Sequence, residues 1–166
     1  MNIFFLDWNP EIAAKYHCDK HVVKMILETA QMLYSVHWVL ELNLPDNAYK
    51  LAHKNHPCSI WARTSLNNYL WLCSLGLSLC NEYTFRYNKI HKTQSHIEWL
   101  FNNPPKFKII NLTLPALAMP LEFKSKDIIK SYRLFYIESK LRERNIVNYS
   151  KREWPNFIVK YKMESL

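Results

Sequence analysis

The stretch 17-HCDKHVVKMILETAQMLYS-35 decides the fold, because its apolar residues recur at intervals of three or four and predict one long amphipathic helix ending near Leu42. The predicted buried face consists of Val22, Met25, Ile26, Thr29, Leu33 and Val36. The polar residues form a second stripe of His17, Lys20, His21, Lys24, Glu28, Gln31 and Ser35. Two imidazoles and two ammoniums around one carboxylate favour the wall of a functional cleft, although a solvated helix face would show the same spacing.

The remaining sequence predicts an all-α fold. The chain has 166 residues, 49% of them hydrophobic, and a single glycine, whereas β-rich folds and glycine-cradled nucleotide sites use more glycine. Further helices are expected over residues 10–16, 59–88, 93–101 and 125–141, and four prolines predict an irregular loop over 102–123. The segment 1–7 is either a strand or an extended arm, and 48–54 could form one or two helical turns. We therefore expect residues 1–166 to form one compact helical bundle around a long central amphipathic helix, with a proline-rich irregular loop.

The charge distribution predicts a polyanionic partner. The net charge is +8, and residues 124–166 carry 11 Lys/Arg against 5 Asp/Glu, whereas residues 1–123 carry 11 against 9. This basic C-terminal region contains interleaved aromatic residues, as nucleic-acid-binding surfaces do, and we expect it to pack on the rest of the domain. The four cysteines form no CxxC pair, which suggests reduced, mostly buried thiols in a cytosol-like compartment. The most apolar segment, residues 70–80, is too short to span a membrane.

Several residues outside the first helix are candidates for phosphate contacts. His56 precedes Pro57 at the start of a helix, where free N–H groups bind phosphate, although a capping turn explains it equally well. Glu82 and Arg86 are four residues apart, which favours a structural ion pair and leaves phosphate binding by Arg86 as the alternative. The C-terminal stretch 140–155 could follow a nucleic-acid backbone. The phosphate-binding candidates are His17, Lys20, Lys24, His56, Arg63, Arg86, Lys151 and Arg152.

No metal or other cofactor is predicted. His17 and His21 have the i, i+4 spacing that zinc uses, but the sequence has no HExxH motif and no third ligand at a diagnostic spacing. Neither GxGxxG nor GxxxxGK(S/T) occurs.

Three motifs together resemble a known family. The helix AAKYHCDKHVVKMILETAQML, the following NHP and IW, and the later EYTFRY are similar to phage and giant-virus relatives of the pyrimidine-dimer DNA glycosylases of the endonuclease V type. The likeness covers roughly residues 1–90, and PALAMPLEFK (115–124) resembles a proline-rich stretch of phage members. The resemblance implies a compact helical protein whose N-terminal amine attacks C1′ of the damaged nucleotide. It further implies that a Schiff base forms and that β-elimination then nicks the strand.

The resemblance also assigns roles to residues of the first helix. It implies that Glu28 stabilises the cationic intermediate, that His21, seven residues earlier, lies beside it, and that Met1 supplies the amine. The chain departs from the family pattern at two points. It begins Met1-Asn2 instead of exposing a threonine amine, since a bulky second residue leaves the methionine in place, and Leu27 occupies the position of an arginine before the glutamate.

The leading hypothesis is a monomeric DNA glycosylase and AP lyase acting on damaged or modified duplex DNA, with Met1, Glu28 and His21 as its catalytic residues. The alternatives are a non-enzymatic nucleic-acid-binding protein and a histidine- or metal-dependent enzyme acting on a nucleotide. No membrane partner is expected. We expect a cytoplasmic location, which for a viral protein means the host cytoplasm, a virus factory or the nucleus.

Overall fold

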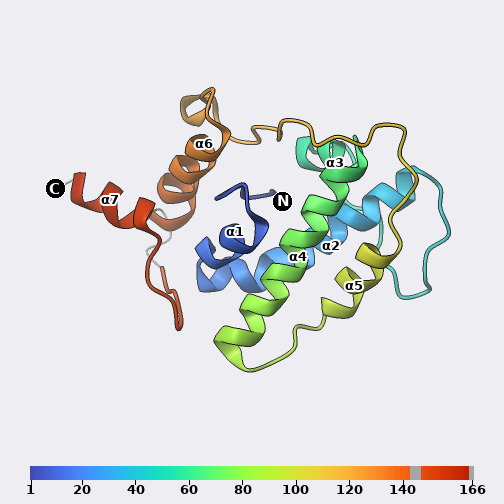
Figure 1. Ribbon diagram of the computed structural model, residues 1–166, viewed down its shortest axis with the longest axis horizontal. Helices are drawn as coiled ribbons and strands as arrows, with labels where there is room; N and C mark the ends of the chain where they lie inside the picture. Colours follow the sequence, from blue (N-terminus) through green and yellow to red (C-terminus); the bar gives the residue numbers. More distant parts are fainter. Residues whose placement is uncertain (143–146, 165–166) are drawn as a thin grey trace.

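The computed structural model describes residues 1–142 and 147–164, and this part of the chain contains helices and no strands (Figure 1). In chain order the elements are α1 (Pro10–Tyr16), α2 (Asp19–Val39), α3 (Pro57–Ala62), α4 (Leu66–Tyr87), α5 (Gln94–Asn102), the 3₁₀ helix η1 (Leu121–Phe123), α6 (Ile128–Phe135), the π-helix η2 (Tyr136–Arg142) and α7 (Asn156–Glu164). The predicted all-α fold class is confirmed. Within the described ranges, no helix combines the length and the apolarity that crossing a membrane requires.

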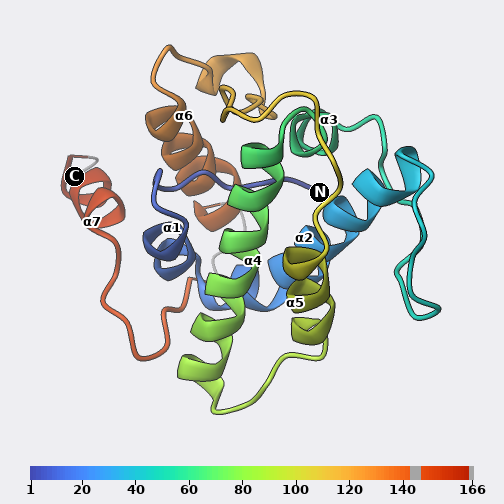
Figure 2. The ribbon, with the colours of Figure 1, turned by 45° about the vertical axis from the view of Figure 1, so that its right-hand side comes forward.

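Helix α2 runs behind α4 in Figure 2 and packs against α3, α4 and α5. All six residues of its predicted buried face are buried, so the periodicity identified the core side correctly. Gly76 explains how closely α4 approaches its neighbours: a Cβ atom there would lie 3.1 Å from side-chain atoms of Ile97 in α5 and of Thr29 in α2. The single glycine of the chain is therefore a packing residue in a helix, where its absent side chain makes room for two other helices.

The first six residues form an extended arm through the interior. Ile3, Phe4, Phe5 and Leu6 are all at most 3% exposed, and the arm pairs with no strand in the described structure. The Phe5 ring stacks on Trp71 of α4 with ring centroids 4.6 Å apart, and it contacts Tyr132 of α6 at 5.2 Å. Because the arm is held between α4 and α6, the N-terminus lies inside the bundle, beside α2 (Figure 1).

The positions where helices begin and end agree better with the capping residues than with the ends of the apolar patterns. Asn9 caps α1, with its side chain accepting from the backbone of Glu11, and Pro10 stands in the first turn as predicted. The single helix expected over 59–88 is two helices, because Ser65 caps a new helix by accepting from the backbone N–H of Asn68 at 3.1 Å. Helix α2 ends at Val39 and not near Leu42. The possible helical turns at residues 48–54 are not formed, and α7 was not predicted from the sequence.

Candidate active site

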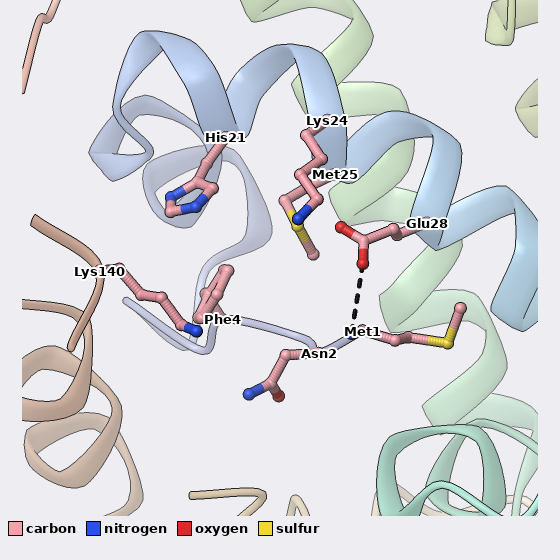
Figure 3. A pocket seen from close by; sticks show the side chains of 8 residues that line it. All are labelled: Met1, Asn2, Phe4, His21, Lys24, Met25, Glu28 and Lys140. Atoms are coloured by element: carbon pink, nitrogen blue, oxygen red, sulfur yellow. Dashed lines mark ion pairs between the residues drawn. The ribbon is translucent and has the colours of Figure 1, made fainter. Parts of the chain in front are cut away.

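The N-terminal amine lies opposite the middle of α2, across a small pocket (Figure 3). The nitrogen of Met1 is 3.4 Å from Oε1 of Glu28, and the two side chains are 3% and 13% exposed. The cavity measures about 70 Å³ and is lined by Met1, Asn2, Phe4, His21, Lys24, Met25, Glu28 and Lys140. The structure thus brings together four of the residues chosen from sequence: Met1, His21, Lys24 and Glu28.

Helix α2 places His21 and Glu28 on the same side of the pocket. Seven residues span two turns, so the two side chains project from one face of the helix. The imidazole of His21 packs on the ring of Phe4 in the arm with centroids 5.2 Å apart, and its Nδ1 lies 2.7 Å from the hydroxyl of Tyr136. The arm and η2 therefore hold the histidine ring from two sides.

Asn2 fixes the arm immediately beside the amine. Its Nδ2 donates to the carbonyl oxygen of Ala118 at 2.9 Å, and its Oδ1 accepts from the backbone N–H of Ile3 at 2.8 Å. The same oxygen accepts from the thiol of Cys58 in α3 at 3.3 Å. Because burial raises the pKa of the Cys58 thiol to about 11, this thiol keeps its proton and remains a donor. Asn2 thus ties the residue carrying the amine to α3 and to the proline-rich loop.

Two cationic side chains line the pocket from opposite elements. Lys24 comes from α2 and Lys140 from the π-helix η2 (Figure 3). Two ammoniums and an amine around one carboxylate give the pocket a positive balance, which suits a substrate with phosphates on either side of the reacting sugar. Lys140 is the first residue of the basic stretch 140–155, but it was not singled out from the sequence, because nothing in its local sequence places it beside the Met1 amine.

His17 belongs to the core and does not line the pocket. Its side chain is fully buried, and its Nδ1 lies 2.6 Å from the carbonyl oxygen of Ala13. Burial lowers the pKa of His17 to about 4, and the nearby Arg86 guanidinium acts in the same direction, so the ring is neutral at pH 7. Lys20 is exposed on α2 and is not among the lining residues.

Arg86 lies in a buried ionic network at the start of α2. It donates to the carbonyl oxygen of His17 at 2.8 Å and to Oδ1 of Asp19 at 3.0 Å, and it pairs with Glu82 at 3.8 Å. Arg152 contacts the same Glu82 carboxylate at 2.7 Å. The Glu82–Arg86 pair expected from the spacing is therefore present, and it is buried.

The C-terminal candidates anchor the chain to α4. Lys151 donates to the carbonyl oxygen of Phe85 at 3.0 Å, next to the Arg152–Glu82 pair. Neither side chain lines the amine pocket. Residues 143–146 of the stretch predicted to follow a nucleic-acid backbone lie outside the described residues.

His56 caps α3 within electrostatic reach of the amine. Its Nδ1 accepts from the backbone N–H of Cys58 at 3.1 Å, so the predicted capping turn is formed. Burial lowers the pKa of His56, the positive amino terminus and His53 lower it further, and Glu28 raises it. Arg63, at the end of α3, donates to the carbonyl oxygen of Lys54.

The comparisons with known proteins give one family. The family described as pyrimidine dimer DNA glycosylase matches residues 1–95, which include Met1, His21 and Glu28 but not Lys140. No curated protein and no solved structure matches the chain. Within the described ranges, no three His, Cys, Asp or Glu side chains are grouped closely enough to hold a metal ion.

Proposed function

The chain belongs to the pyrimidine dimer DNA glycosylase family, and from this premise we propose that it is a DNA glycosylase and AP lyase whose nucleophile is the α-amine of Met1. The observation that carries the proposal is the distance of 3.4 Å between the Met1 nitrogen and Glu28, in a pocket that His21 also lines. An amine, a carboxylate and an imidazole in one small cavity are the groups that imine chemistry on a sugar requires.

In the proposed reaction, the neutral amine attacks C1′ of the damaged nucleotide. The N–C1′ bond forms as the base departs with the electron pair of the glycosidic bond. Loss of the amine proton and opening of the C1′–O4′ bond give a cationic Schiff base. Removal of a C2′ proton then expels the 3′ phosphate and cuts the strand, and hydrolysis of the imine frees the amine.

Glu28 stabilises charge in this reaction, and His21 transfers protons. Glu28 lies close enough to the amine nitrogen to stabilise the positive charge that develops on it. His21 lines the same pocket, and its imidazole is placed to transfer a proton to the opening sugar or from C2′. Lys24 and Lys140 hold the flanking phosphates, which fixes the position of the sugar without reading the base sequence.

The burial of the amine limits how DNA can reach it. The side chains of Met1 and Glu28 are 3% and 13% exposed, so the sugar of a nucleotide stacked inside a duplex does not reach the amine directly. The duplex must therefore bend or rotate the nucleotide toward the amine. Such distortion costs a few kcal/mol and least where pairing is already weakened, so it favours damaged sites.

The test uses three labelled duplexes: one with a single cyclobutane pyrimidine dimer, one with a single abasic site and one undamaged. We expect strand cleavage of the first two and none of the third. Cleavage of the abasic duplex alone would retain the lyase and remove the glycosylase from the proposal. Tight binding without cleavage of any duplex would instead support the alternative of a non-enzymatic DNA-binding protein.

A further inference from the structure

We infer that Tyr136 is a positioning residue for His21: its hydroxyl engages Nδ1 and presents the Nε2–H side of the ring to the amine pocket. This inference rests on the proposed function, because it concerns the group that transfers protons there. Tyr136 is the first residue of the π-helix η2 and lies outside residues 1–95, which the family model matches.

The contacts of the Tyr136 hydroxyl come from the beginning of α2. The oxygen lies 2.7 Å from Nδ1 of His21 and accepts from the backbone N–H of Cys18 at 2.9 Å. Tyr136 is fully buried, and its ring packs against both Phe4 and His21 with centroids 5.0 and 5.2 Å away. One hydroxyl thus connects the N-cap residue of α2 to the histidine one turn into the helix.

The proton positions follow from what each group can do. A backbone N–H can only donate, so the Cys18 bond occupies a lone pair of the hydroxyl oxygen. Burial raises the pKa of Tyr136 well above its ordinary value, so the hydroxyl keeps its proton and can donate it to Nδ1. A neutral imidazole that accepts at Nδ1 carries its hydrogen on Nε2. Nδ1 faces Tyr136, which does not line the pocket, so the opposite edge of the ring, formed by Nε2 and Cδ2, is the edge left to face the pocket.

The Tyr136 hydroxyl can hydrogen-bond to Nδ1 of His21 whether the ring is neutral or protonated. When the ring gains a proton during the reaction, Nδ1 becomes a donor, and the hydroxyl can turn to accept from it. Among the described residues, the ionisable groups that contact His21 or line its pocket include Cys18, Lys24 and Glu28 from its own segment, the Met1 amine from the arm, and Tyr136 with Lys140 from η2. Neither Tyr136 nor Cys18 lines the pocket, and the Tyr136 hydroxyl makes the shorter contact with Nδ1, at 2.7 Å against 3.5 Å for the Cys18 thiol, so the hydroxyl orients the ring and need not touch substrate.

The geometry of η2 explains why one short element supplies two functions. A π-helix has more residues per turn than an α-helix, so two residues four positions apart point in different directions from those they would take in an α-helix. Such segments occur often at functional sites. Here Tyr136 reaches the buried side of His21, while Lys140 reaches the pocket itself.

The experiment compares Tyr136→Phe with Tyr69→Phe. Tyr69 is the matched control, because it is also fully buried, its hydroxyl lies 3.0 Å from Nε2 of another histidine, His37, and it donates to the carbonyl oxygen of Leu100 at 2.7 Å. The ¹⁵N signals of the His21 ring are measured by NMR in the wild type and in both variants, with His21→Gln to assign them. The single-turnover rate on an abasic duplex and the affinity for that duplex are measured in parallel.

We expect the wild-type ring to carry its proton on Nε2, Tyr136→Phe to change the ¹⁵N signals of His21, and Tyr69→Phe to leave them unchanged. Tyr136→Phe should lower the single-turnover rate about tenfold to a hundredfold at unchanged affinity, a part of what general acid–base catalysis contributes. A wild-type ring protonated on Nδ1, unchanged His21 signals in Tyr136→Phe, or changed signals with an unchanged rate would each overturn the inference.

The two proposals fail in different ways. If the wild type does not cut the abasic duplex at all, the proposed function is wrong, and the NMR signals still decide whether Tyr136 sets the state of His21. If Tyr136→Phe does not fold, the wild-type ¹⁵N signals alone decide, because the inference requires the proton on Nε2.

Discussion

Replacing Glu28 with glutamine removes the carboxylate beside the Met1 amine while keeping the length of the side chain. Opposite unit charges at the observed 3.4 Å attract by about 5 kcal/mol at an effective dielectric constant of ~20. The Glu28 side chain is 13% exposed, so water screens part of this attraction. We therefore expect the rate on an abasic duplex to fall by about 10² to 10³, the range found when one group that stabilises developing charge is removed. The free energy of unfolding should also fall, by about 1–3 kcal/mol, because the variant leaves the buried amine without its carboxylate.

The assay is the single-turnover cleavage rate of a labelled abasic duplex, because product release does not contribute to that rate. The matched control is Glu11→Gln, which makes the same chemical change to a surface pair, Lys15–Glu11, of nearly equal length at 3.3 Å. The control should retain the wild-type rate, and urea unfolding should show that both variants are folded. If the cleavage rate of Glu28→Gln stays within about threefold of the wild-type rate, the charge of this carboxylate does not stabilise the reacting amine, and its electrostatic role is refuted.

Three further predictions concern the amine, pH and the C-terminal segment. Acetylating the Met1 amine, or preceding it with an uncleaved tag, should abolish cleavage while DNA binding measured by fluorescence anisotropy persists, because an amide nitrogen is not nucleophilic. The pKa of His17 is about 4 in the fold against 6.5 for an ordinary histidine, so the unfolded chain binds more protons between these pH values. The free energy of unfolding should therefore fall as the pH drops from 6.5 to 4, by up to about 1.4 kcal/mol per pH unit, and urea titrations of His17→Gln should lack this contribution. Glu82→Gln should cost about 3 kcal/mol in the same assay, because Arg86 and Arg152 lose their shared buried carboxylate, whereas Glu138→Gln at the exposed pair with Arg142 should cost under about 1 kcal/mol.

Apolar periodicity predicted the fold class because it records which side of each helix is buried. The face of α2 and the presence of α1, α4, α5 and α6 follow from it. Periodicity does not reveal where a helix restarts, as it does at Ser65, nor a change from α to π geometry, as at Tyr136. Helix α7 was not predicted because it is only nine residues long and also exposes Val159 and Met163, which obscures the apolar face formed by Phe157, Ile158 and Tyr161.

The site could be predicted from sequence only where it lies on one helix. His21 and Glu28 share α2, so their spacing fixes their relation. His17 seemed to continue the same stripe, but α2 begins at Asp19 and His17 is the C-cap of α1, so the helical spacing does not apply to it. Asn2 and Lys140 reach the pocket through contacts between segments far apart in the chain, which no local pattern encodes.

The most direct test of the central claim is borohydride trapping followed by peptide mapping. The untagged protein is incubated with an abasic duplex and reductant, which converts a Schiff base into a stable secondary amine, and mass spectrometry then locates the modified residue. We predict a covalent adduct at the α-amine of Met1. An adduct on the side chain of Lys24 or Lys140, or no adduct despite tight binding and cleavage, would contradict the Met1 amine as the nucleophile.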